Sequence, residues 1–196
     1  MSNVAEKIAV DTFTFKNLWK NHPIIADNGK ACIGGGFPQK PGEVITIGNQ
    51  CAINVSVAFE KCGLEVGKWG IQLCNLAKKE ESHRNHAIRA EELANELRKR
   101  NIKGIGSLQK ITPEDFNISL AGKTGIIFFK DYWRRKRETF GNRSGDHIDF
   151  WDGSKTTSAG WFRLNMLNSL DLGFIHPRLQ YSDLQNSRAI WFWAVS

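Results

Sequence analysis

The stretch Cys51–Gly63, CAINVSVAFEKCG, indicates a helix around which the fold can be organised. Its apolar residues recur at helical spacing, and Gly63 stands where a left-handed residue commonly ends a helix. These apolar residues are Ala52, Val55, Phe59 and Cys62. We therefore predict a largely buried helix with Cys51 in its first turn.

The position of Cys51 has a chemical consequence. The helix dipole and the unpaired amide groups at a helix N-terminus stabilise a thiolate, and a thiolate is a nucleophile. The same amides can hold the oxyanion that forms when a thiolate attacks a carbonyl group. Of the four cysteines, Cys51 alone is expected at such a place. It is a candidate nucleophile, and the alternative is a small core residue.

A candidate base lies on a predicted strand, Asp146–Trp151. Side chains two positions apart on a strand point to the same side, so His147 and Asp149 share a face. A carboxylate beside an imidazole fixes the tautomer and supports the positive charge that the ring acquires in catalysis. We therefore predict Cys51, His147 and Asp149 as the catalytic residues. A purely structural His–Asp pair is the alternative.

The remaining pattern places helices early and strands late. Phe13–Trp19 and Ala87–Leu97 show helical spacing, and residues 34–42 read as a long loop. Strands are predicted at Ile126–Phe129, which should be central, and at Ala189–Val195, whose tryptophans should be core residues. This order favours an α+β fold in which the helix with the nucleophile packs on an antiparallel sheet.

Composition limits the class of protein. The 196 residues are 41% hydrophobic and include 12 Phe and 7 Trp, enough for a core, so we expect a single domain over residues 1–196. No apolar window is long enough for stable membrane insertion, and no signal peptide is recognisable, so we expect synthesis in the cytoplasm. The net charge of +7 favours an anionic partner such as nucleic acid, a membrane surface or a cell wall.

Four ordered blocks resemble a known family. They are Gly48–Ser56, His86–Ala94, Gly122–Ile127 and Ser144–Gly153. Together they are similar to the fourth family of type VI secretion amidase effectors, and the similarity extends from about Gly35 to the last strand. Four blocks in the same order are more specific than any single motif.

The resemblance implies a papain-like fold of the NlpC type and an antibacterial toxin. Such a toxin hydrolyses the γ-D-glutamyl-meso-diaminopimelate bond in peptidoglycan peptide stems, without a metal or a cofactor. Cys51 matches the nucleophile of the family and His147 its histidine. Some members carry the orienting carboxylate where this chain has Ser158, so Asp149 is preferred as the third residue, with Asp152 and Ser158 as alternatives.

The resemblance also implies partners and a place of action. We expect a cognate immunity protein, export by the type VI secretion machinery, and activity in the periplasm of a target Gram-negative cell. The expected partners include no nucleic acid.

Two other functions compete with this interpretation. A basic nucleic-acid-binding module could use Arg98–Arg100 and Arg134–Arg137, with Tyr132 and Trp133 stacking on bases. A papain-like peptidase or deamidase acting on a protein would use the same Cys51 and His147.

The remaining cysteines and histidines predict no metal site. The cysteines are irregularly spaced with no CxxC pair, and a disulfide among Cys32, Cys62 and Cys74 stays open. His83 and His86 could ligate a metal from one helix face, but no third ligand is evident in the sequence. We therefore expect two exposed polar residues.

Overall fold

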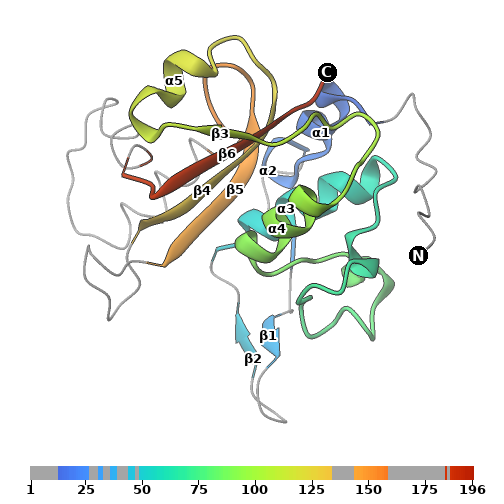
Figure 1. Ribbon diagram of the computed structural model, residues 1–196. Helices are drawn as coiled ribbons and strands as arrows, with labels where there is room; N and C mark the ends of the chain where they lie inside the picture. The colour runs from blue at the N-terminus through green and yellow to red at the C-terminus, as the bar shows by residue number, and fades with distance from the viewer. Residues whose placement is uncertain are drawn as a thin grey trace.

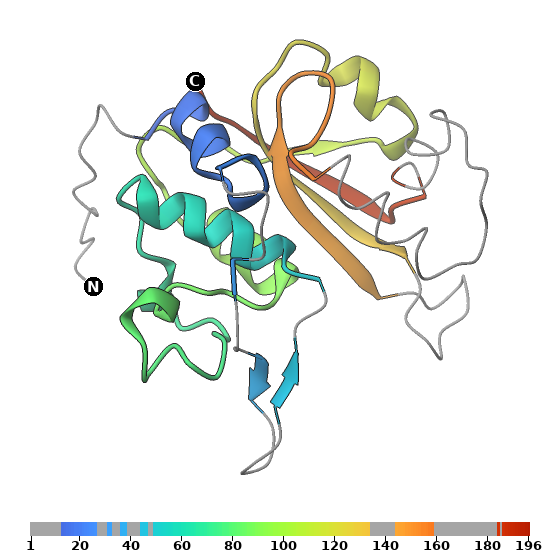
Figure 2. The same cartoon turned by 180° about the vertical axis from the view of Figure 1, so that it is seen from behind.

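The computed structural model describes residues 13–26, 31–32, 36–38, 44–46, 49–133, 144–158, 184 and 186–196. A layer of helices packs on one face of a sheet, and a further short helix, α5 (Phe116–Ser119), packs on the other face (Figures 1 and 2). The helices of the first layer are α1 (Phe15–Asn21), α2 (Pro23–Ala26), α3 (Cys51–Lys61) and α4 (Ala90–Lys99). Short 3₁₀ turns span Val66–Lys68, Glu81–His83 and Pro113–Asp115.

The sheet has four antiparallel strands in the order β3-β6-β4-β5. The strands are β3 (Gln109–Ile111), β4 (Gly125–Trp133), β5 (Gly145–Trp151) and β6 (Ala189–Ala194). The predicted α+β class is therefore confirmed, and the run Ile126–Phe129 is central because β4 pairs with strands on both sides. The strand that carries His147 lies at an edge of the sheet.

Alternating side chains of the sheet divide the interior into two cores. Large apolar residues on one face meet α3 and α4, whereas their neighbours in sequence meet Phe116 of the α5 side. The face toward the helices carries Ile126, Phe128, Ile148, Phe150, Trp191 and Trp193. The opposite face carries Ile127, Phe129, Trp151, Ile190 and Phe192. The predicted burial of the tryptophans is confirmed, since Trp191 is 8% exposed and Trp193 is 2% exposed.

Helix α3 begins and ends as the sequence predicts. It starts at Cys51, and Gly63 follows it with a φ of 87°. The Leu64 amide donates to the Phe59 carbonyl over 2.9 Å, which closes the last turn. The Phe59 ring lies 6.0 Å from that of Phe150, so the helix is held directly against β5.

Two predicted segments differ from the structure. Helix α4 begins at Ala90, after Ala87, because Ala87 forms an isolated bridge with Leu73 and its amide is held by the Ser56 hydroxyl. The segment expected to be a long loop, residues 34–42, contains the strand β1 (Gly36–Pro38). This strand pairs with β2 (Val44–Thr46), which follows the segment, and both lie away from the main sheet in Figure 1. Strands of three residues are too short for an alternating pattern to reveal them.

Some predicted segments lie outside the described residues. These are the basic loop Arg134–Arg137 and the glycines Gly34 and Gly35. Among the residues that are described, no helix combines the length and the apolar character that a membrane crossing needs.

Candidate functional site

Cys51 is the first residue of α3, and its surroundings fix the start of that helix. Its amide donates to the Asn49 side-chain oxygen over 3.1 Å. The preceding residue, Gln50, is 2% exposed and forms two side-chain hydrogen bonds of 2.9 Å with the backbone of Cys32. The Cys51 side chain is partly buried and lies at the positive end of the helix dipole.

His147 reaches Cys51 because α3 packs against β5. The Cys51 side chain is near enough to the imidazole to raise the pKa of His147. The imidazole is 4% exposed and stacks on Phe129 at 6.3 Å, with the Tyr132 ring edge-on at 6.1 Å. The residues predicted from helix spacing and from strand alternation therefore meet in space.

Asp149 holds the imidazole from its other side. The Nε2 atom of His147 lies 3.2 Å from Oδ2 of Asp149. An ionised carboxylate only accepts hydrogen bonds, so Nε2 carries the hydrogen of the neutral ring. The second nitrogen, Nδ1, is then the atom through which this ring can take up a proton.

The Asp149 carboxylate is 1% exposed and well supplied with donors. It accepts from the Phe150 amide at 2.8 Å and the Ser158 amide at 3.0 Å, and from the Thr157 and Ser158 hydroxyls. His22 lies nearby, with its Nε2 atom 3.6 Å from Oδ1. A buried carboxylate held by this many donors is kept ionised.

The electrostatics favour a protonated ring beside an ionised carboxylate. Burial alone would lower the pKa of His147, but the hydrogen bond to Asp149 and the interaction with Cys51 outweigh it and raise the pKa to about 10. Burial alone would raise the pKa of Asp149, but hydrogen bonding to His147 and the nearby His22 hold it well below its usual range. The arrangement can therefore store and deliver a proton next to a sulfur atom.

Ser158 and Asp152, the alternatives to Asp149 as the third catalytic residue, lie in different surroundings. The hydroxyl oxygen of Ser158 lies 3.1 Å from Nε2 of His147, so Ser158 belongs to the same network. Asp152 accepts from the Ser154 amide and hydroxyl and from the Lys155 amide, which makes it part of the turn after β5.

Sequence reasoning missed Thr157 and His22. Thr157 reaches Asp149 because the chain turns back after β5, where Gly153 has a φ of 97° and the Thr157 amide donates to the Phe150 carbonyl over 3.2 Å. The Asp152-Gly153 turn signal indicates such a return. We find no sequence signal that brings His22 to Asp149.

Comparison with known proteins places the chain in a family. The model of the family "Type VI secretion system (T6SS), amidase effector protein 4", Tae4, matches residues 47–193. This range includes most of the chain. The chain belongs to the Tae4 family. It therefore belongs among the amidase effectors of the type VI secretion system, as its four sequence blocks predict.

A solved structure is also similar. The crystal structure of the type VI effector-immunity complex Tae4-Tai4 from Enterobacter cloacae contains a chain with 17% sequence identity and a TM-score of 0.41. The match covers 77% of this chain and 84% of that chain. No curated protein sequence matches.

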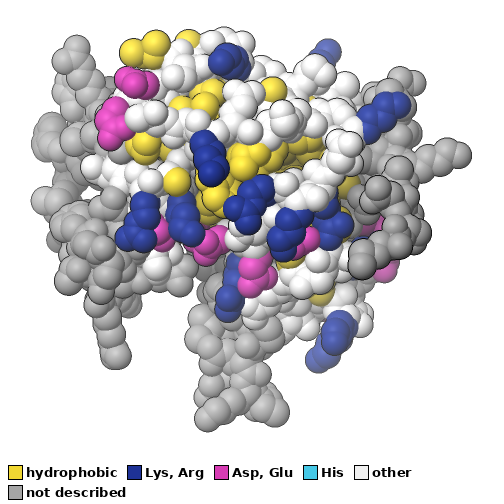
Figure 3. All heavy atoms as spheres, viewed as in Figure 1, with side chains coloured by type: hydrophobic (Ala, Val, Ile, Leu, Met, Phe, Trp, Pro, Cys, Tyr) yellow, Lys and Arg dark blue, Asp and Glu magenta, His cyan; other side chains and the backbone are white. Residues whose placement is uncertain are grey.

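Basic residues near the end of α4 contact the chain itself. The Arg98 guanidinium lies 5.2 Å from the Trp191 ring centroid, and that of Arg100 lies 4.8 Å from Trp69. Lys99 and Arg100 also form ion pairs with Glu96 at 2.7 and 2.8 Å. Figure 3 shows acidic side chains interspersed among the basic ones on this face.

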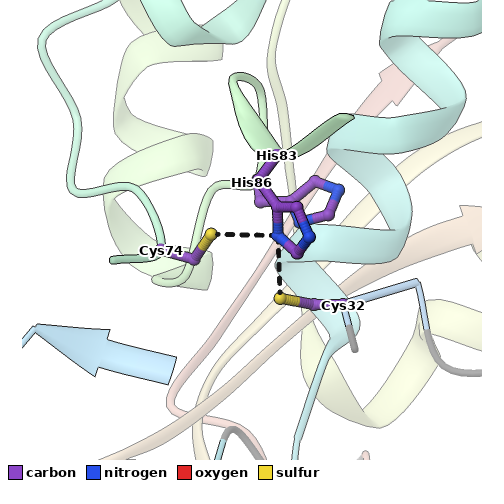
Figure 4. Close-up of side chains that lie close together, drawn as sticks. All are labelled: Cys32, Cys74, His83 and His86. Carbon is purple, nitrogen blue, oxygen red and sulfur yellow. Dashed lines mark hydrogen bonds between the residues drawn. The ribbon is translucent and has the colours of Figure 1, made fainter. Parts of the chain in front are cut away.

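The structure contradicts the prediction for His83 and His86. They are buried, with exposed fractions of 6% and 3%, and two further candidate ligands, Cys32 and Cys74, lie beside them (Figure 4). Cys32 and Cys74 are far from each other in sequence, so their spacing gave no signal. None of the four cysteines of the chain, all within its described part, forms a disulfide.

Proposed function

We propose that this chain hydrolyses the γ-D-glutamyl-meso-diaminopimelate bond in peptidoglycan peptide stems. Cys51 is the nucleophile, His147 the general acid and base, and Asp149 the residue that orients the imidazole. One observation carries the proposal: a cysteine at a helix N-terminus lies beside a buried histidine, whose pKa it raises, and that histidine is hydrogen bonded to a buried carboxylate. Membership of the amidase effector family supports the reaction class. We assign residues 1–196 to one papain-like domain of the NlpC type.

In the first step the sulfur of Cys51 attacks the γ-glutamyl carbonyl carbon. A carbon–sulfur bond forms, and the carbonyl oxygen becomes an oxyanion that amides in the first turn of α3 can stabilise. When this intermediate collapses, the carbon–nitrogen bond breaks. The protonated His147 then gives its proton to the departing diaminopimelate amine.

In the second step water replaces the sulfur. His147, now neutral, takes a proton from the attacking water, and the thioester is hydrolysed to a γ-carboxyl group. The thiolate of Cys51 and the protonated His147 are restored. Asp149 keeps Nε2 bound throughout, so the ring presents the same face to sulfur, amine and water.

The place of action and the partners follow from the same proposal. Delivery by the type VI machinery would bring the enzyme to the periplasm of a Gram-negative target, where the peptide stems are accessible. The Enterobacter cloacae protein forms an effector-immunity complex. We propose that a cognate immunity protein likewise protects the producer of this chain by covering Cys51.

The competing functions have less support. Arg98 and Arg100 contact tryptophans of their own chain, so they give no specific support to nucleic-acid binding. A peptidase or deamidase acting on a protein would use the same three side chains, and the identity of the product distinguishes it.

The proposal is tested by incubating the pure protein with muropeptides that contain diaminopimelate and identifying the products by mass. We expect cleavage at the γ-glutamyl bond by the wild type and none by Cys51→Ala. Cys62→Ser is the matched control, because Cys62 caps the opposite end of the same helix. It should retain activity.

Other results would exclude the proposal. Cleavage that persists in Cys51→Ala would mean that another residue is the nucleophile. Products cut in the sugar chain would exclude an amidase, and intact muropeptides beside a deamidated or cleaved test protein would favour the protein-directed alternative.

A further inference from the structure

Four potential metal ligands meet in the interior, apart from Cys51 and His147. Cys32, Cys74, His83 and His86 are each at most 6% exposed, and their candidate ligand atoms all lie within 4.8 Å of one another. Figure 4 shows both sulfur atoms pointing toward the same ring nitrogen of His83, with the His86 ring beside it. This is a complete set of two thiols and two imidazoles.

Two of the spacings in the cluster match edges of a tetrahedron around a metal ion. Both sulfur atoms lie 3.4 Å from Nδ1 of His83. With Zn–S bonds of about 2.3 Å and Zn–N bonds of about 2.0 Å, a tetrahedral site separates sulfur from nitrogen by roughly 3.5 Å. These two distances therefore fit a tetrahedral site, and the remaining ligand atoms lie within 4.8 Å of one another.

The outer contacts of the histidines also suit metal binding. The Nε2 atom of His83 lies 3.4 Å from a carboxylate oxygen of Glu80. Metal-bound histidines commonly donate their second N–H to a carboxylate, which fixes the tautomer and leaves the other nitrogen to the metal. The Nδ1 atom of His86 is buried and forms no hydrogen bond with any residue that the structure describes.

We propose that these four side chains bind one Zn²⁺ in a closed, structural site. Sulfur and imidazole ligands in tetrahedral geometry favour zinc, and four protein ligands leave no position for substrate. Binding releases the two thiol protons. The resulting two thiolates and two neutral imidazoles balance the ion, so the buried site carries no net charge.

The zinc would join the start of α3 to distant segments. Cys32 lies in the chain after α2, Cys74 and the histidines lie between α3 and α4, and the Cys32 backbone holds the side chain of Gln50. Gln50 immediately precedes the candidate nucleophile. Zinc therefore stabilises the segment that places Cys51, while taking no part in the chemistry.

The experiment measures metal content in protein purified from zinc-supplemented culture without a metal-affinity tag. We expect about one zinc per wild-type chain, as for a closed four-ligand site. Cys74→Ser and His83→Ala should lose it. Cys62→Ser and Cys51→Ser make the same change at cysteines outside the site and should keep it.

Cobalt replacement tests the ligands without any substitution. Wild-type protein refolded with Co²⁺ should show the intense visible bands of a tetrahedral ion and sulfur-to-cobalt charge transfer in the near ultraviolet. This readout remains available if a variant fails to fold. Since it reports metal binding alone, its outcome is independent of whether the chain cleaves muropeptides.

Three results would overturn the proposal. The first is wild-type protein that contains little zinc and takes up none on refolding. The second is an octahedral cobalt spectrum without sulfur bands. The third is a disulfide between Cys32 and Cys74 in the purified protein, detected by mass after alkylation without reduction.

Discussion

At the scale of single residues, Asp149 sets the properties of the candidate site. Its carboxylate is buried, bonded to His147, and held in place by backbone amides on either side of the turn after β5. It is the first of the influences that raise the pKa of His147. This chemistry depends on a negative charge, so a neutral side chain of the same shape should not replace it.

We predict that Asp149→Asn reduces kcat/KM by about 10²- to 10⁴-fold, the range typical of losing an orienting carboxylate. The alkaline limit of activity, expected near the His147 pKa of about 10, should move to lower pH because the histidine loses its proton sooner. The measurement is the pH profile of muropeptide cleavage for both proteins, with circular dichroism to verify folding.

Ser158→Ala is the matched comparison, since this hydroxyl contacts both His147 and Asp149 but carries no charge. It should lower the rate by about tenfold or less, the range of a single neutral hydrogen bond, and leave the alkaline limit in place. If Ser158→Ala were the more damaging of the two, the third catalytic role would belong to the serine.

The same residues show what a sequence can specify at this scale. Strand alternation was enough to put His147 and Asp149 on one face, and helix spacing was enough to start α3 at Cys51. The hydrogen bond from Thr157 depends on the return of the chain after β5, and the nearby position of His22 depends on the packing of α1 and α2. Both are contacts between segments that no local sequence pattern predicts.

At the scale of elements, the contact between β4 and β6 depends on a missing side chain. A Cβ atom on Gly125 would lie 2.2 Å from the Trp193 carbonyl oxygen and 2.7 Å from the Phe192 ring. Gly125 is also the first residue of β4 and pairs with both neighbouring strands. The two strands can approach each other here only because glycine is present.

We predict that Gly125→Ala lowers the free energy of unfolding by about 2 kcal/mol or more, because backbone and ring must both shift. Gly70→Ala is the control: its φ is +75°, yet no atom would lie within 4 Å of the new Cβ. It should lose only about 1 kcal/mol from backbone strain. Urea denaturation measures both, and equal losses would contradict the packing explanation.

The elements themselves were predictable where a long pattern existed. The run Ile126–Phe129 and the terminal tryptophan strand are continuous apolar segments, and both are strands in the structure. The predicted start of α4 at Ala87 is wrong. Ala87 and Ile88 are buried like helix residues, but their amides donate to Ser56 and Gln72. A pattern of buried residues therefore does not distinguish a helix from a segment whose amides bond to other parts of the chain.

At the scale of the whole molecule, His22 should make stability sensitive to acid. Burial lowers its pKa from 6.5 to about 4, against the raising influence of Asp149. A lowered histidine pKa means that the unfolded chain takes up the proton first. The stability that comes from keeping His22 neutral is thus complete above pH 6.5 and is lost as the pH falls toward 4.

We predict that His22→Gln gains about 3 kcal/mol of unfolding free energy relative to wild type between pH 6.5 and 4. The variant must be compared with the wild type at each pH, because Asp146 also changes the stability over this range. Burial raises the pKa of Asp146 to about 6, so its effect on stability with falling pH is opposite to that of His22. Chemical denaturation at several pH values gives that difference. A constant offset at all pH values would mean that His22 titrates normally.

Fold class and family were within reach of the sequence, whereas the cluster of Cys32, Cys74, His83 and His86 was not. Apolar periodicity is a local property, and the order of helices and strands follows from it. A set of ligands drawn from separate segments exists only after the tertiary structure has formed. The sequence accordingly predicts two exposed histidines, whereas both are buried in the structure.

The placement of the two candidate catalytic side chains in different layers has a consequence during synthesis. Cys51 opens α3, whereas His147 lies on β5, which is made much later. A nascent chain on the ribosome therefore carries the thiol without its imidazole while about half of the 196 residues are made. The two side chains can act together only after β5 has been made and has packed against α3.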